Sequence, residues 1–173
     1  MLSPQDLLVA LKLLQAEAPT HSYALLGRSL GLSQTQVHEA CERLTVSRLL
    51  RPGTFTPIRA SLVSVLVKGV PYFLPAPQEG EELVRRVSTG CAVAPLPGTA
   101  AQPVVWPHEQ GANEGYALQP LCPEAVGAAQ RDPGLYQLLA LTDLVRSHRS
   151  GLRERSLAAQ RLEHLILEPV AAV

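Results

Sequence analysis

Residues 22–46, SYALLGRSLGLSQTQVHEACERLTV, constrain the fold of this chain more than any other segment. They predict two helices joined by a turn of only three residues. The first helix covers 22–30 and ends at Gly31, because glycine adopts the left-handed backbone of a helix cap without a Cβ penalty. Ser33 can cap the second helix. Two helices joined this tightly have to pack on each other and share a core with flanking segments.

The second helix is expected over 34–49 and has two chemically different faces. Val37, Cys41 and Leu44 recur at helical spacing and predict a buried face. The opposite face carries short polar side chains, which are Gln34, Thr35, Gln36, His38, Glu39 and Arg43. Side chains of this kind can reach base edges in the major groove of DNA.

Residues 26–37, LGRSLGLSQTQV, resemble the helix-turn-helix of bacterial winged-helix regulators of the broad MarR-like kind. The segment ERLTVSRLL at 42–50 resembles the end of the second helix in that family. Arg48 occupies the usual glycine position there, and Gly27 replaces the usual alanine of the first helix. The resemblance covers about residues 1–55. It implies DNA binding, with the six polar residues of the second helix facing the groove.

Several arginines around this motif are candidates for contacts with the DNA backbone. Arg28 and Arg51 are expected to contact phosphates, because charge alone suffices there. For Arg43 and Arg48 two interpretations are open, namely phosphate contacts or pairing with Glu39 and Glu42 on the helix surface. The role of His38 is equally open between base contact, phosphate contact and plain exposure.

The formal net charge of the chain is zero, which by itself argues against a nucleic-acid binder. The distribution is uneven, however. Residues 1–68 contain seven Lys and Arg against four Asp and Glu, a net charge of +3, and the remainder carries −3. DNA affinity depends on the local field where phosphates approach, so a modestly basic head remains compatible with DNA binding.

Around the motif, the pattern predicts a first helix over 4–16, capped by Ser3 with a proline in its first turn. Residues 57–69 fit either a strand or a helix, and Gly69 as a terminator favours the helix. Residues 72–74 are expected to form a short strand.

The middle of the chain is rich in proline and glycine. Residues 75–103 are expected to be mostly loop, with one or two helical turns over 81–87. Strands over 104–106 and 116–118 are expected to form a hairpin that resembles a wing, with Trp106 anchoring it to the helices.

The C-terminal part is predicted to be helical over 123–130, 133–145 and 152–167. The second of these is apolar on nearly all sides and should be buried. The last two helices are the predicted seam of a homodimer. Four arginines near their junction are either a solvated basic surface or a docking surface for an acidic partner: Arg146, Arg149, Arg153 and Arg155.

The predicted fold class is mainly α with a small β-sheet (α+β), a winged helix-turn-helix head followed by C-terminal helices. The head is expected over 1–75, the loop and hairpin over 76–122, and a helical region for dimerisation or partner binding over 123–173. No apolar run is long enough to span a bilayer and no secretory leader opens the chain, so a cytoplasmic location is expected.

Chemistry at a catalytic or metal site is not expected. The chain has no P-loop, dinucleotide-binding or nucleophile-elbow motif, so it is predicted not to be an enzyme and to need no cofactor. Cys41, Cys91 and Cys122 have no metal-binding spacing. Cys41 is expected in the core, and Cys91 is the better candidate for a redox sensor. For His108, beside Glu109 and Glu114, a solvated turn is favoured over a metal site.

Two functions remain open from the sequence. The first is a sequence-specific transcriptional regulator, which binds double-stranded DNA as a homodimer through residues 34–46. The alternative is a protein-interaction adaptor, for example the antitoxin-like partner of a neighbouring enzyme. An adaptor of this kind could also bind DNA and regulate its own operon. Steep loss of affinity with salt is expected of the first and not of the second.

Overall fold

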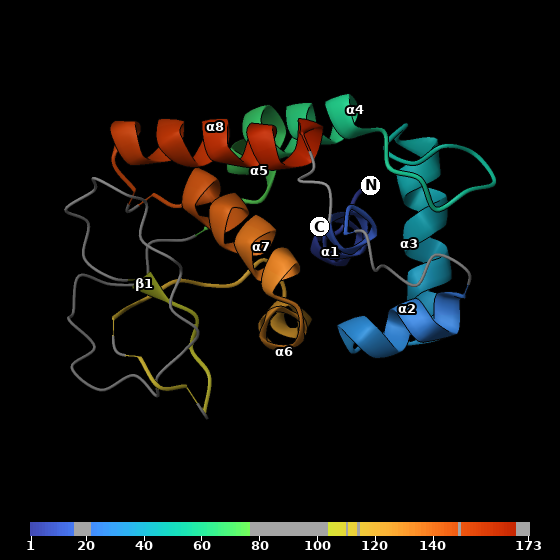
Figure 1. Ribbon diagram of the computed structural model, residues 1–173, viewed down its shortest axis with the longest axis horizontal. Coiled ribbons are helices and arrows are strands. Elements are labelled where there is room, and N and C mark those ends of the chain that lie inside the picture. Colours follow the sequence, from blue (N-terminus) through green and yellow to red (C-terminus); the bar gives the residue numbers. More distant parts are fainter. Residues whose placement is uncertain (16–21, 77–103, 110, 114, 149, 169–173) are drawn as a thin grey trace.

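The computed structural model describes residues 1–15, 22–76, 104–109, 111–113, 115–148 and 150–168 (Figure 1). This part of the chain is mainly helical with one small sheet, as predicted. The helices are α1 (Pro4–Leu13), α2 (Tyr23–Leu30), α3 (Gln34–Val46), α4 (Arg59–Ser64), the π-helical turn η1 (Val65–Gly69), α5 (Val70–Phe73), α6 (Pro123–Arg131), α7 (Pro133–Arg146) and α8 (Leu152–Leu167). The strands are β1 (Val104–Val105) and β2 (Tyr116–Ala117). The predicted turns over 81–87 and the candidate sensor Cys91 lie outside the described residues.

Helix α7 lies at the centre of the molecule and is buried around its circumference, as its all-apolar pattern predicts. Leu135, Leu139 and Leu144 belong to a single hydrophobic cluster that extends from α1 to α8. The three predicted regions therefore share one core, and α7 packs against α8, α6, α1 and α5 within the same chain (Figure 1).

This packing corrects the part of the predicted dimer seam that involves α7. The apolar surface of α7 is used inside the chain, so it is not available to a second copy. Helix α8 turns Ala158, Leu162 and Ile166 inward and exposes Leu152 and Leu167 among its large apolar residues. The homodimer itself remains a prediction.

The predicted docking surface around 146–155 also needs correction, because Arg146 is buried. Its Nε donates to Oδ1 of Asp143 at 2.6 Å, and its terminal nitrogens donate to the carbonyls of Leu74 and Gln119. Trp106 donates its indole N–H to Oδ2 of the same carboxylate at 2.6 Å, which confirms that this tryptophan is a buried anchor. A buried guanidinium needs such partners, since leaving it unpaired is costly. Arg153 is exposed, Arg155 is half-buried, and Arg149 lies outside the described residues.

Residues 59–73 are helical throughout, so the helix favoured over 57–69 is confirmed from Arg59 onward and the strand over 72–74 is wrong. The helix does not end at Gly69 but continues into α5. Pro71 has no N–H to donate, so a regular α-helical ladder cannot pass through it unbroken. The π-helical turn η1 ends at Gly69, two residues before this proline, in line with the use of such turns where a ladder is interrupted.

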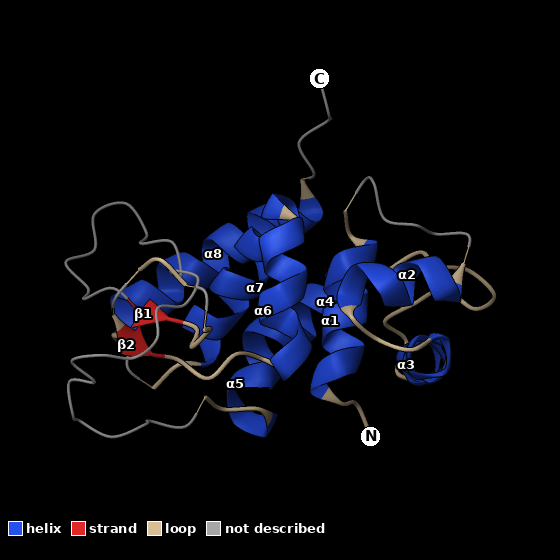
Figure 2. Ribbon diagram, turned by 90° about the horizontal axis from the view of Figure 1, so that it is seen from below, coloured by secondary structure: helices blue, strands red, loops and turns tan. Residues whose placement is uncertain are grey.

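The predicted hairpin is also wrong, because β1 and β2 pair in parallel, with Val104 opposite Tyr116 and Val105 opposite Ala117. Strands joined in a hairpin run antiparallel, so these two cannot form one. Figure 2 shows the sheet at the end of the molecule away from α2 and α3. It therefore cannot serve as a wing beside α3.

Polar contacts between distant segments fix α1 and α2 against the C-terminal helices. The Nζ of Lys12 lies 2.6 Å from Oδ2 of Asp132, and this pair is largely shielded from water. Two further contacts join Gln5 to Glu124 (2.9 Å) and Arg131 to the carbonyl of Ser29 (3.2 Å). Within the described residues, none of the helices has the length and apolar character needed to cross a bilayer.

Candidate nucleic-acid interface

The turn between α2 and α3 is held by two glycines. Gly31 has φ = 76°, the left-handed conformation predicted for the cap of α2. The N–H of Leu32 donates to the carbonyl of Gly27 at 2.9 Å. A Cβ placed on Gly27 would lie 2.5 Å from the carbonyl oxygen of Leu32, far inside van der Waals contact. Gly27 therefore permits a close approach between α2 and the backbone of the turn.

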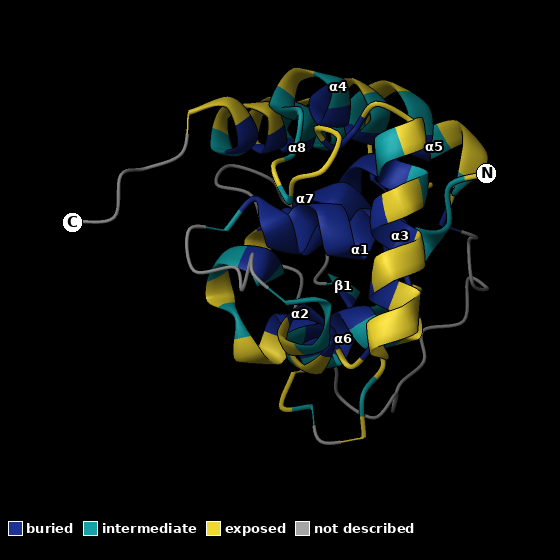
Figure 3. Cartoon of the chain, turned by 90° about the vertical axis from the view of Figure 1, so that its right-hand side faces the viewer, coloured by how far each residue is buried: buried dark blue, intermediate teal, exposed yellow. Residues whose placement is uncertain are grey.

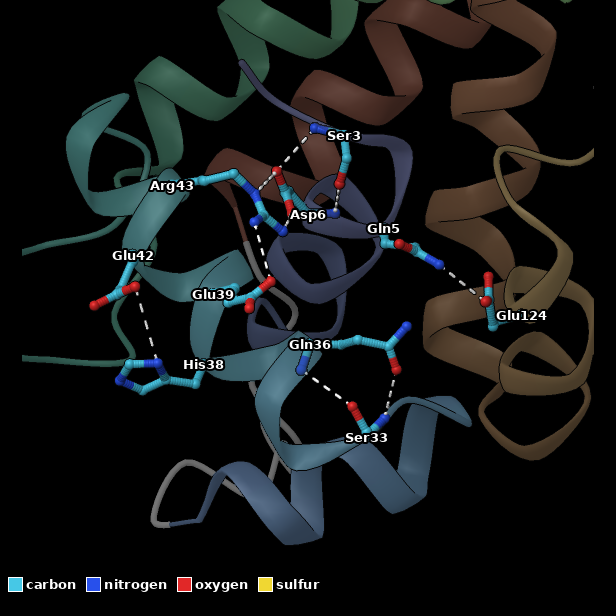
Figure 4. Close-up of polar contacts among 10 residues, drawn as sticks. All are labelled: Ser3, Gln5, Asp6, Ser33, Gln36, His38, Glu39, Glu42, Arg43 and Glu124. Carbon is cyan, nitrogen blue, oxygen red and sulfur yellow. Dashed lines mark hydrogen bonds and ion pairs between the residues drawn. The ribbon is translucent and has the colours of Figure 1, made fainter.

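Helix α3 begins with a reciprocal capping box. The Oγ of Ser33 accepts from the N–H of Gln36 at 3.2 Å, and Oε1 of Gln36 accepts from the N–H of Ser33 at 2.9 Å (Figure 4). Two backbone donors that the helix leaves unsatisfied are thereby paired. Gln36, predicted to face the groove, thus has a structural role at the start of α3.

The two faces of α3 divide as predicted. Val37, Cys41 and Leu44 are buried, and burial, together with the nearby Asp6, raises the pKa of the Cys41 thiol to about 11. The thiol is thus a core group, as expected. The outer face stands clear of the other helices (Figure 3). Its exposed polar residues are Gln34, Thr35, Gln36, His38, Glu39 and Glu42.

Arg43 differs from the other predicted groove-facing residues because its guanidinium is held within the chain. Its Nε and one terminal nitrogen donate to the two carboxylate oxygens of Asp6 at 2.9 and 2.8 Å (Figure 4). Hydrogen bonding to Asp6 raises the pKa of Arg43. The other terminal nitrogen lies 3.6 Å from Oε2 of Glu39. Of the two interpretations open for Arg43, pairing within the chain describes the observed geometry.

His38 lies at an aromatic contact between three elements. Its ring meets the ring of Tyr23 from α2 edge to face, with centroids 5.1 Å apart, and Tyr23 also contacts Phe55 at 5.0 Å. The Nδ1 of His38 lies 3.9 Å from Oε2 of Glu42, one turn further along α3. Half of the imidazole side chain stays exposed, so packing on one side leaves the other side open to a ligand.

Phe55 belongs to a short hairpin that the sequence analysis missed. Leu50 and Pro57 form an antiparallel bridge. Around it, the N–H of Arg51 donates to the carbonyl of Thr56 at 3.0 Å, and the N–H of Ile58 donates to that of Leu49 at 2.8 Å. The signal was present in the sequence, because the turn pair Pro52-Gly53 lies between short apolar segments on both sides. This hairpin, residues 49–58, directly follows α3.

Exposed arginines flank α3 at both ends. Arg28 lies on α2, Arg51 on the hairpin, and Arg48 in the turn that joins α3 to the hairpin. Arg48 has φ = 58°, the left-handed backbone conformation that favours glycine. It adopts this conformation although its Cβ makes it costly. The centre of the outer face is instead acidic, since Glu39 and Glu42 both project there. The charge of this surface is thus positive at its margins and negative in the middle.

No group of three or more metal-ligating side chains occurs in the described part of the chain. Comparisons with protein-family models, with curated proteins and with solved structures find no match to this chain.

Proposed function

We propose that this chain is a sequence-specific DNA-binding transcriptional regulator that inserts α3 into the major groove. The observation that carries the proposal is the outer face of α3, which is exposed along its length and rich in polar side chains. An α-helix with such a face fits the width of the major groove and can present hydrogen-bonding groups to base edges.

The surroundings of α3 support the same function. A tight turn with a left-handed glycine sets α2 across the start of α3, and the hairpin 49–58 extends beside its end. Arg28, Arg48 and Arg51 on these flanking elements are available for phosphates, which contribute most of the affinity and none of the specificity. In this proposal the hairpin 49–58 serves as the wing, and the strands β1 and β2 do not.

The test is a titration of labelled random-sequence duplexes at 50 and 200 mM salt, followed by fluorescence anisotropy. A protein that contacts six or more phosphates loses roughly a thousandfold in affinity over this range. Arg51→Ala is expected to lower the slope of log affinity against log salt by about one. Arg153→Ala is the matched control, because it removes the same charge at the start of α8, away from α3 (Figure 1). Absence of binding at low salt would contradict the proposal.

A single helix-turn-helix contacts few base pairs, so the regulator is proposed to act as a homodimer on a palindromic site. Light scattering at micromolar protein concentration, with and without a duplex that the protein binds, measures the number of chains in the particle directly. A complex that contains one chain on one half-site would remove the dimer from the proposal.

The acidic centre of α3 favours a second candidate, a protein-interaction adaptor that binds a basic partner. Glu39 and Glu42 lie one turn apart on the same exposed face, and the whole chain has no net charge. The titration separates the two functions, because an adaptor shows no duplex binding even at low salt.

A further inference from the structure

Three side chains form a linked series that extends from the core to the outer face of α3. They are Asp6, Arg43 and Glu39 (Figure 4). Asp6 is fully buried and also accepts from the N–H of Ser3 at 2.8 Å, within the capping box of α1. It holds Arg43 by two hydrogen bonds. Arg43 in turn lies 3.6 Å from the carboxylate of Glu39, whose side chain remains 55% exposed.

This series changes which residue can contact a base. A guanine is recognised by an arginine that donates two hydrogen bonds to O6 and N7. Arg43 has already committed two donors to Asp6, and its remaining terminal nitrogen faces Glu39. Releasing Arg43 would leave a fully buried carboxylate without its counter-charge, which is costly. Arg43 is therefore a positioning residue, and Glu39 is the group that the series presents to the outside.

Glu39 is the sixth residue of α3 and lies in the half of the helix that enters a major groove first. A carboxylate can only accept hydrogen bonds, and near DNA the phosphates repel it. It is favourable there only where a base edge offers a donor. Cytosine presents its N4 amino group as such a donor, with no acceptor of the same base beside it in the groove. Adenine also presents a donor, its N6 amino group, but beside the acceptor N7, and the N7 and O6 of guanine and the O4 of thymine are acceptors that disfavour a carboxylate.

We propose that Glu39 contacts the N4 amino group of a cytosine in each half-site, with Arg43 and Asp6 holding its carboxylate in place. The inference rests on the proposed DNA-binding function and adds a base preference to it. Because Arg43 restricts the rotamers of Glu39 before DNA arrives, less side-chain freedom is lost on binding. The positive charge of Arg43 also offsets part of the repulsion between Glu39 and the nearest phosphate.

The experiment is selection of bound duplexes from a random-sequence pool, with sequencing, for the wild-type protein and for Glu39→Gln. The wild type is expected to enrich one strongly preferred cytosine per half-site. In Glu39→Gln the preference for that cytosine should fall by about tenfold or more, and adenine should rise at the same position, because an amide pairs with adenine N6 and N7.

Glu42→Gln is the matched control. It removes the same charge from the same face, but among the described residues the carboxylate of Glu42 contacts the imidazole of His38, at 3.9 Å, and no arginine. Both variants are expected to bind non-specific DNA more tightly, and Glu42→Gln should keep the cytosine preference. In Arg43→Lys, which cannot make the paired contact with Asp6, the preference should weaken while the protein stays folded by circular dichroism.

The outcomes separate the inference from the proposed function. If Glu39→Gln binds and enriches the same sequences as the wild type, the assignment of Glu39 is overturned while the DNA-binding function stands. An unchanged preference in Arg43→Lys overturns the positioning role of Arg43. If the wild type enriches no duplex at low salt, the DNA-binding function fails, and the inference fails with it.

Discussion

Helices α3 and α7 each place an arginine on a fully buried aspartate, yet the two pairs have different surroundings. Arg146 of α7 is 4% exposed in its side chain and directs its donors to Asp143 and to backbone carbonyls of other segments. Arg43 of α3 is 36% exposed and has Glu39 and solvent on its outer side. The first pair is enclosed by protein, and the second links the core to a surface.

The comparison shows that a buried arginine–aspartate pair can either join distant segments in the core or orient a helix at the surface. Around α7, the Asp143 carboxylate accepts hydrogen bonds from Trp106 and Arg146. Arg146 also donates to the carbonyls of Leu74 and Gln119. This joins segments far apart in sequence. Around α3, the Asp6 carboxylate fixes the orientation of one helix whose other face stays open. Disruption of the first should therefore affect stability, and disruption of the second should also affect what the open face does.

The largest effect is expected for Asp143→Asn. It removes the charge of the carboxylate that pairs with Arg146, whose guanidinium is almost fully shielded from water, so the unfolding free energy should fall by about 3–5 kcal/mol. Urea denaturation followed by circular dichroism measures the change. Glu163→Gln on the exposed face of α8 is the control and should alter stability by less than about 0.5 kcal/mol.

The same substitution at Asp6 tests the comparison directly. Asp6→Asn should cost about 1.5–3 kcal/mol, less than Asp143→Asn, because the partly exposed Arg43 can turn to water when its partner loses charge. The same denaturation assay applies. Equal losses in the two variants would show that the exposure of the arginine does not matter, contrary to the comparison.

Gly27→Ala tests the tight turn that orients α3. The new Cβ would meet the carbonyl oxygen of Leu32 at 2.5 Å, and backbone cannot move away as a side chain can. A net loss of about 1–3 kcal/mol is expected, despite the better helix propensity of alanine. Gly127→Ala in α6 is the matched control, since its nearest neighbour is a flexible Arg131 nitrogen at 3.6 Å. That variant should gain up to about 1 kcal/mol, and a similar loss in both would contradict the explanation.

The smallest effect is expected for Arg48→Gly, and it should be stabilising. Relief of the left-handed strain contributes roughly 1–2 kcal/mol, and the greater freedom of glycine in the unfolded chain removes about 0.5–1 kcal/mol of that. Thermal denaturation should show a net gain of about 0.5–1 kcal/mol, absent in Arg48→Ala. If Arg48 contacts a phosphate, both variants lose the same DNA affinity, because both lose the charge. Only Arg48→Gly gains stability, because only glycine relieves the backbone strain.

Local signals in the sequence predicted the helices around α3 well. Ser3, Ser22 and Ser33 each accept a hydrogen bond at the start of a helix, and Gly31 ends α2 in the left-handed conformation. These features act over three or four residues, so the sequence alone contains the whole interaction. The same holds for the buried face of α3 and for the burial of α7 from Leu138 to Arg146, which follow from the apolar patterns of the two helices.

The incorrect predictions involve contacts between distant residues. The strand predicted over 72–74 is wrong, because Tyr72 and Phe73 belong to α5, which contains Pro71 and follows a π-helical turn. Arg146 was assigned to the surface because it is charged, yet Asp143 and two distant carbonyls make its burial possible. Nothing local to Arg146 indicates those carbonyls, which belong to residues 72 and 27 positions away.

The sequence by itself determined the two-helix motif, its polar and apolar faces and the central burial of α7, because caps and periodicity are encoded within a few turns. Only the tertiary structure decided which polar groups of α3 remain available. From the sequence, Arg43 is one more polar residue on the outer face of α3, but Asp6, 37 positions away, accepts hydrogen bonds from two of its donors. The availability of a side chain depends on what the rest of the chain brings to it: on α3, Asp6 holds Arg43, whereas the side chain of Glu39 stays 55% exposed.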